Sequence, residues 1–496
     1  MEKTSVATIR LEGEPYVQKV TTHDGVVTVD STGVLESLAS NSKYKENLPI
    51  SLGKNKQLVE ILDQGKGYYF LDQALQDRRA LSLNEAGSLI TLVCSVLNTV
   101  LKDTLTKTLS EHPHLQMNIL QAACLLKALS MKEAYVSLTA DEIAGMVAST
   151  TRLDTVAHFH SDEPLFSFGG MGGDKGYTKA KRHSKLFSLS TLSAIGLSVD
   201  GKVQKHHSYP NTSKVAGQSA IEEYGARSDF ETTGAMEKIL NETSLLMTSC
   251  HSVRTLHSLS HQLRGETVNH AIGPLAFPTT VDTALHGFIG VNEKIHPETI
   301  VESMKRLDER GYQKFGNSVA FCGTDLHEIP TTMFDPNLYI QDNSSREHVR
   351  IDEIAPPPFA SLAAFLIDGK NIGTFALYPE DFFSPKTLCT LDSNALFIPN
   401  TKESIIDANL CALSGQEHSK TLYLAMTIGL GIFLQQYAAA SDAFDEDSRR
   451  VSSYYLRSAT DRAVEIVRSG AAGQQLKRYV AATQAFAGST QRVGIL

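Results

Sequence analysis

The residues best suited to chemistry lie in four polar clusters between positions 169 and 214. The first is a glycine-rich turn, GGMGGD at 169–174, which directly follows an apolar run at 165–168 that predicts a short buried strand. Glycines in such a turn can adopt positive φ and leave backbone N–H groups open to an anion. The second cluster, SLST at 188–191, places hydroxyl groups where a helical pattern begins, and a helix N-terminus favours phosphate.

The other two clusters carry lysines as well as hydroxyl groups. KHHS at 205–208 ends a second short strand pattern, and NTSK at 211–214 precedes another helical pattern. Polar turns that follow strands and precede helices meet at one end of an open α/β sheet. A glycine-rich turn alone often marks an ordinary loop. Four such clusters in succession, however, predict a site for a ligand with several phosphates.

The order of these clusters resembles the anthranilate phosphoribosyltransferase family, which shares its fold with the pyrimidine nucleoside phosphorylases. Residues 170–174 correspond to the family's glycine-threonine-glycine-glycine-aspartate turn, and 188–191 to its asparagine-isoleucine-serine-threonine. Residues 205–208 correspond to its lysine-histidine-glycine-asparagine, and 212–214 to its serine-serine-lysine turn. A later segment, GPLAFP at 273–278, is similar to its glycine-proline-leucine-threonine-asparagine-proline turn.

The resemblance covers roughly residues 82 to 487 and implies an α/β fold. Residues 160–490 would form a large phosphoribosyl-binding domain, with a mostly parallel central sheet flanked by helices. Residues 81–150 would form a small all-α domain, joined by helices from about 275–310, which typically carries the dimer face. Residues 1–80 stand apart from the family core, and alternating patterns there predict short strands in an N-terminal α+β extension of unknown role.

The activity implied by the resemblance is transfer of a phosphoribosyl group from phosphoribosyl pyrophosphate, with Mg²⁺, to an aromatic or nitrogen-containing acceptor. Such an enzyme must hold the pyrophosphate and stabilise its developing charge. The expected catalytic residues are Lys205 and His206. The expected substrate-binding residues are Gly170, Gly172, Gly173, Asp174, Ser188, Ser190, Thr191, Lys205, Ser208, Ser213, Lys214 and His261. The metal is expected on Ser190, Asp325 and Glu328, although His327-Glu328 stands where the family has an adjacent aspartate-glutamate pair.

The acceptor side departs from the family pattern. Ser208 stands where the family has its anthranilate-binding asparagine, and Ser260 or His261 stands where it has an arginine. Loss of a guanidinium group removes the bidentate partner of an aromatic carboxylate. Anthranilate is therefore the acceptor by default, and the departures favour a different or modified one. Histidines that could shape its pocket, or that could simply be solvated or core residues, are His206, His207, His257, His261 and His270.

Two other classes of protein stay open. The glycine turn also resembles that of the nucleoside phosphorylases, although the helical pattern from 459 to 486 fits the transferases better. A non-catalytic, nucleic-acid-binding relative would account for the altered motifs and for the basic segment at 175–185. The net charge of −9 disfavours broad binding to nucleic acid or to a membrane surface.

Composition and cysteine usage set the broad class. The 496 residues are 42% hydrophobic and 20% charged, which is typical of a globular protein. The six cysteines are scattered without metal or disulfide spacing, and no apolar leader is visible, so a cytoplasmic protein is expected. The family resemblance implies a homodimer. The longest apolar stretch, at 422–434, is short and broken by glycine, which predicts a buried core helix and no membrane span.

Overall fold

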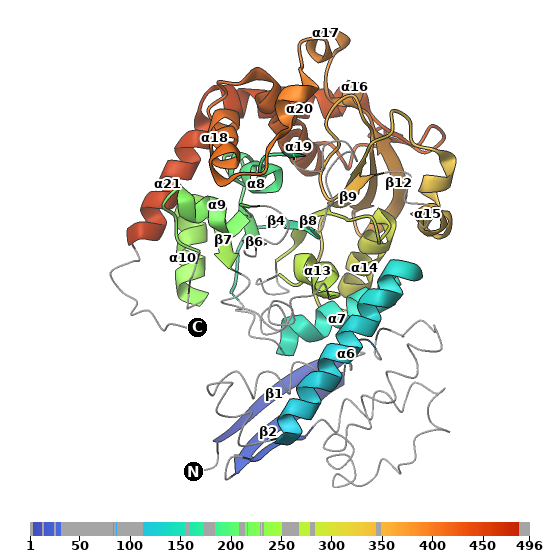
Figure 1. The fold of residues 1–496 in the computed structure, drawn as a ribbon, viewed down its shortest axis with the longest axis vertical. Coiled ribbons are helices and arrows are strands. Elements are labelled where there is room, and N and C mark those ends of the chain that lie inside the picture. The colour runs from blue at the N-terminus through green and yellow to red at the C-terminus, as the bar shows by residue number, and fades with distance from the viewer. Residues whose placement is uncertain are drawn as a thin grey trace. The chain divides into compact units, whose positions relative to one another are not determined.

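The computed structural model describes residues 3–11, 14–23, 26–30, 83, 86, 113–153, 159–172, 184–207, 214–215, 217–228, 230, 233–249, 267–277, 283–343 and 349–485 (Figure 1). The chain divides into two compact units. One comprises residues 1–156, 253–278 and 306–312, and the other comprises residues 157–252, 279–305 and 313–496. The three-part division expected from the sequence stays a prediction.

A ten-stranded sheet forms the centre of the second unit. Its parallel part is ordered β7-β6-β4-β8-β9, with β7 at Leu245–Ser249, β6 at Val203–His207, β4 at Leu165–Gly170, β8 at Leu285–Gly290 and β9 at Ser318–Thr324. Beyond β9 the sheet continues through antiparallel β11 (Ser361–Ile367) and β12 (Lys370–Leu377). Short strands complete it: β10 (Arg350–Ile351), β14 (Phe444–Asp445) and β15 (Arg450–Val451). The expected α/β fold with a central sheet flanked by helices is confirmed.

The parallel strands form where the sequence has short apolar runs. β4 is buried over its first five residues, and all seven residues of β9 are buried, as expected for strands covered on both faces. Aromatic rings link neighbouring strands: Phe168 lies 4.6 Å from Phe288 and Phe288 lies 4.9 Å from Phe321, measured between ring centroids. This packing fixes the relative positions of the loops that follow β4, β8 and β9.

Helices surround this sheet, some of them packed on its strands and others packed on neighbouring helices (Figure 1). Their bounds are α8 at Leu189–Leu197, α9 at Gly217–Glu223, α10 at Thr233–Thr243, α14 at Pro297–Glu309, α15 at Pro336–Asn343, α16 at Pro379–Phe382, α17 at Pro385–Leu388, α18 at Lys402–Leu413, α19 at His418–Gln436, α20 at Ser453–Arg468 and α21 at Ala471–Ala485. Short 3₁₀ turns lie at Thr331–Phe334 and Ser393–Leu396, and β5 (Ser184–Lys185) pairs with β13 (Ile398–Pro399). Helix α8 packs against β4 and β6, and α10 packs against β7.

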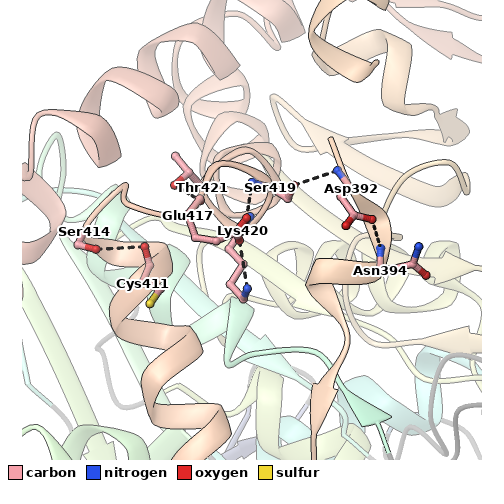
Figure 2. Close-up of polar contacts among 8 residues, drawn as sticks. All are labelled: Asp392, Asn394, Cys411, Ser414, Glu417, Ser419, Lys420 and Thr421. Atoms are coloured by element: carbon pink, nitrogen blue, oxygen red, sulfur yellow. Dashed lines mark hydrogen bonds and ion pairs between the residues drawn. The ribbon is translucent and has the colours of Figure 1, made fainter. Parts of the chain in front are cut away.

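Helix α19 contains the longest apolar stretch and is buried throughout it, which confirms the expected core helix. Its glycines allow neighbouring helices to approach closely, because a Cβ at Gly429 would lie 2.6 Å from Thr460 Oγ1 on α20. Glu417 caps the start of this helix, because its carboxylate accepts hydrogen bonds from Ser419 N (3.0 Å) and Lys420 N (2.8 Å), as Figure 2 shows. In the described part of the chain, no helix is long and apolar enough to cross a membrane.

The first unit contains an antiparallel sheet and two long helices. The strands β1 (Lys3–Leu11), β2 (Glu14–His23) and β3 (Val26–Asp30) pair in sequence order. The helices are α6 (Pro113–Tyr135) and α7 (Ala140–Leu153), followed after a long sequence interval by α13 (Asn269–Ile272) and a 3₁₀ turn at Gly273–Leu275. Thr139 and Glu142 exchange hydrogen bonds at the start of α7, so that a capping box sets where this helix begins.

Candidate functional site

The candidate site lies in the second unit, at the carboxyl ends of the parallel strands. Strand β4 ends at Gly170, and Met171 N then donates a 3.0 Å hydrogen bond to Gly290 O at the end of β8. Gly172 has φ of +63°, a conformation that favours glycine. The first part of the expected glycine turn therefore lies at the end of the sheet where open α/β folds bind ligands.

Lys205 and Ser190 meet at this end of the sheet. Lys205 lies in β6, is only 5% exposed, and its Nζ donates a 3.3 Å hydrogen bond to Ser190 Oγ in the first turn of α8. Thr191, the next residue of that turn, is buried. A lysine and two hydroxyl groups thus gather at a helix N-terminus, a combination that can stabilise phosphate charge.

Asn409, a residue that the sequence analysis did not single out, positions Ser188, the residue before α8. Its Oδ1 accepts a 2.8 Å hydrogen bond from Ser188 N, and its Nδ2 donates a 3.1 Å hydrogen bond to Ser188 Oγ. Asn409 lies fully buried in α18. The amide side chain thereby fixes the start of α8, and with it the positions of Ser190 and Thr191.

The segment before α9 forms a second wall. Lys214 is exposed, and its backbone N donates a 3.0 Å hydrogen bond to Asn400 Oδ1. Gly217, the first residue of α9, lies between Thr191 and His207, since a Cβ there would be 3.0 Å from both Thr191 Oγ1 and His207 Cβ. The helix that follows Lys214 therefore packs directly against the turn that carries Thr191.

Two buried histidines end β6, and they occupy different faces of the strand. Successive side chains of a strand alternate in direction, so His207 shares a face with Lys205 and His206 projects to the other face. Burial lowers the pKa of His207 to about 3, and the positive charge of Lys205 adds to the effect. The imidazole of His207 is therefore neutral at physiological pH.

An acidic pair that the sequence analysis did not single out crosses the ends of the strands. Asp352 Oδ2 accepts a 2.7 Å hydrogen bond from Gly172 N. A Cβ at Gly290 would lie 1.8 Å from Asp352 O, and one at Gly323 would lie 2.5 Å from Glu353 O. The backbone at Asp352-Glu353 thus passes over the ends of β8 and β9, where only glycine leaves it room, and delivers a carboxylate to the glycine turn.

The expected metal ligands after β9 have other surroundings. Asp325 Oδ1 accepts a 3.0 Å hydrogen bond from Val349 N, and Glu328 is exposed beside the likewise exposed His327. A role for Asp325 and Glu328 in metal binding stays a prediction. Among the residues for which the structure gives positions, no three His, Cys, Asp or Glu side chains converge as a protein-only metal centre.

Several expected site residues cannot be compared with the structure, because they lie outside the described residues. These are Gly173, Asp174, Ser208, Ser213 and His261, together with the acceptor-side candidates His257 and Ser260. His270 is described and lies in the first unit. Its Nε2 is 2.5 Å from Glu133 Oε1 and its Nδ1 is 2.5 Å from Thr267 O, so this ring is held on both sides by protein groups.

Proteins of one named activity resemble this chain in sequence. The anthranilate phosphoribosyltransferase of Methanosphaera stadtmanae is 28% identical over 265 residues, which are 52% of this chain and 63% of the relative. That of Pyrococcus furiosus is 28% identical over 210 residues, 42% of this chain and 57% of the relative. The chain thus spans less than two thirds of the length of each of these relatives. No model of a known protein family matches it.

Solved structures extend the likeness to the fold. Anthranilate phosphoribosyltransferase from Thermus thermophilus superposes with a TM-score of 0.56 at 19% identity, covering 84% of this chain and 99% of that one. The Saccharomyces cerevisiae enzyme in complex with PRPP and Mg superposes with a TM-score of 0.58 at 15% identity, covering 86% of this chain and 99% of that one.

The class defined by these comparisons is structural: the chain has an α/β fold like that of the solved anthranilate phosphoribosyltransferases. More particularly, the resemblance to the anthranilate phosphoribosyltransferase family that the four polar clusters indicated is confirmed.

Proposed function

We propose that this protein is a phosphoribosyltransferase that uses phosphoribosyl pyrophosphate as its donor. The observation that carries the proposal is the contact between Lys205 Nζ and Ser190 Oγ at the carboxyl end of the parallel sheet. A cation, hydroxyl groups and the backbone of a glycine turn suit a pyrophosphate leaving group. The sequence relatives and the solved structures named above support the same activity.

The reaction would break the bond between C1 of the ribose and the pyrophosphate oxygen, and form a bond from C1 to an acceptor nitrogen. The electron pair of the broken bond goes to the pyrophosphate, and the acceptor nitrogen releases a proton. Lys205 would stabilise the charge that develops on the leaving group, with Ser190 and Thr191 as hydrogen-bond donors. Lys214 would face the ligand from the second wall, and His206 stays a proposed catalytic residue.

A divalent cation fits the oxygen donors at this site. Carboxylate and hydroxyl oxygens are the ligands that Mg²⁺ prefers, and it usually keeps phosphate oxygens and waters as its other ligands. We therefore propose Asp352 and Glu353, with Ser190, as the residues that hold Mg²⁺. The ion would neutralise pyrophosphate charge when it is bound. Asp352 supports this assignment because its carboxylate already lies at the glycine turn, 2.7 Å from Gly172 N.

The acceptor is proposed only by class. An aromatic or nitrogen-containing small molecule fits the resemblance, with anthranilate as the first candidate, and a Saccharomyces cerevisiae enzyme of this fold was solved with 4-fluoroanthranilate. The exchange of the family's asparagine for Ser208 and the absence of its arginine favour an acceptor that does not need a bidentate carboxylate partner.

We also propose that the protein acts as a homodimer.

Calorimetric titration with phosphoribosyl pyrophosphate, with and without Mg²⁺, tests the proposal. Metal-dependent binding of the donor is expected, followed by pyrophosphate release when the correct aromatic amine or nitrogen heterocycle is added. Binding of DNA or RNA that weakens with salt, without donor binding, would instead identify a nucleic-acid-binding protein. Phosphorolysis of nucleosides by inorganic phosphate would identify a phosphorylase.

A further inference from the structure

His207 is a buried imidazole at the candidate site whose ring nitrogens have no hydrogen-bond partner within the described part of the chain. Its side chain is at the end of β6 and is 7% exposed. Among the residues whose positions are described, neither Nδ1 nor Nε2 has a hydrogen-bond partner. Buried polar atoms are nearly always satisfied, so each exception calls for an explanation, such as a ligand that binds there.

The position of His207 points to the donor side of the site. It shares a strand face with Lys205, and the charge of Lys205 acts on its ring. Gly217 packs against both His207 Cβ and Thr191 Oγ1, which places the histidine between the turn of α8 and the start of α9. The turn of α8 carries Ser190 and Thr191, and α9 begins three residues after Lys214, so the histidine lies beside residues proposed to bind the donor.

We propose that His207 is a donor-binding residue whose imidazole N–H donates a hydrogen bond to the pyrophosphate group of phosphoribosyl pyrophosphate. This inference rests on the proposed function and adds a residue to it. Glycine stands at this position in the family motif that residues 205–208 resemble, so the contact would be one that this motif does not supply. A neutral imidazole always carries one N–H, and an anion beside it supplies the missing acceptor.

A matched set of variants tests the inference with inorganic pyrophosphate and Mg²⁺ as the probe. His207→Leu removes both nitrogens but keeps an apolar side chain, whereas His207→Gln keeps a donor. His286→Leu is the control. His286 is a half-buried histidine of the sheet whose pKa is also lowered chiefly by burial, but it lies at the opposite end of its strand, with its Nδ1 2.9 Å from Asn317 O.

The expected result is roughly tenfold weaker pyrophosphate binding in His207→Leu, because a hydrogen bond to a charged group is lost. The affinities of His207→Gln and His286→Leu for pyrophosphate should lie within about threefold of that of the unmodified protein. Unchanged affinity in His207→Leu overturns the inference, while a large loss in Lys205→Ala alongside it leaves the proposed function standing. Failure of the unmodified protein to bind pyrophosphate overturns both.

A measurement on the unmodified protein covers the case in which His207→Leu does not fold. The ring nitrogens of histidine can be labelled with ¹⁵N, and the His207 signals identified by their absence in His207→Gln. Addition of pyrophosphate and Mg²⁺ should shift a His207 ring signal and leave those of His286 unchanged. Binding without any shift of the His207 signals overturns the inference.

Discussion

At the scale of single residues, the site depends on partners that are far away in the sequence. Asp352 reaches Gly172 across 180 positions, and Asn409 reaches Ser188 across 221. Each long-range bond fixes a backbone N–H of a turn that is proposed to face phosphate. The clusters that carry the chemistry are local in sequence, but the groups that position them are not.

The two candidate acidic sites can be separated by a pair of single substitutions. Asp352→Asn keeps an oxygen that can accept from Gly172 N but removes the charge that favours a cation. We expect it to raise the Mg²⁺ concentration needed for donor binding by at least about tenfold. Asp325→Asn is the control and should change this concentration little, because the Asp325 carboxylate accepts a hydrogen bond from Val349 N, away from the glycine turn. The reverse order of effects in calorimetric titrations would restore Asp325 and Glu328 as the metal ligands.

His296 makes the stability of the second unit sensitive to acid. Its Nδ1 accepts a 3.1 Å hydrogen bond from Glu298 N and its Nε2 lies 2.9 Å from Met333 O, which fixes one neutral tautomer. Burial lowers its pKa to about 4, so below pH 6.5 the unfolded chain binds a proton that the folded chain does not. The free energy of unfolding should therefore fall as pH drops from 6.5 towards 4, by at most ~1.4 kcal/mol per pH unit for this group.

This pH dependence can be checked by measuring the free energy of unfolding of His296→Asn and of the unmodified protein at pH 7 and pH 5. The variant should be less stable at pH 7 but should lose less on acidification than the unmodified protein. His160→Asn, at an exposed position, serves as the control and should follow the unmodified protein. An equal loss on acidification in His296→Asn and in the unmodified protein would contradict this account of His296.

At the scale of elements, sequence patterns predicted most of what carries the site. The apolar run at 165–168 lies in β4, the helical pattern that begins at 188–191 is α8, and the second short strand pattern is β6. These predictions of strands and helices succeed because strand and helix periodicities are local properties of the chain. The acidic pair could not be found in this way, because the chain contains five adjacent Asp-Glu pairs and the segment with α15 separates Asp352 from β9.

The contact between α19 and α20 gives a prediction about packing. A Cβ at Gly429 would lie 2.6 Å from Thr460 Oγ1 and 2.8 Å from Thr460 Cα, so Gly429→Ala must push the two helices apart. We expect a loss of about 1–3 kcal/mol in the free energy of unfolding. Gly473→Ala in α21 is the matched control, since its nearest contact would be Leu413 O at 3.9 Å, and it should gain about 0.4–1 kcal/mol. Denaturant titrations that show no loss for Gly429→Ala would refute the packing argument.

At the scale of the whole molecule, every described residue that we propose to bind the donor or the metal belongs to the second unit. The parallel sheet brings together loops that lie far apart in the sequence, which is what an extended, highly charged ligand requires. The first unit contains α6, α7 with its capping box, and a separate antiparallel sheet. Its contribution to acceptor binding and to dimer formation stays a prediction.

The most direct test of the central claim is the affinity of Lys205→Ala for phosphoribosyl pyrophosphate in the presence of Mg²⁺. Lys205 lies against Ser190 in the middle of the proposed site, so its removal should weaken donor binding by at least about 100-fold without unfolding the protein. Circular dichroism and thermal unfolding of the same sample establish that the variant is folded. A folded Lys205→Ala protein that binds the donor as tightly as the unmodified protein would contradict the account.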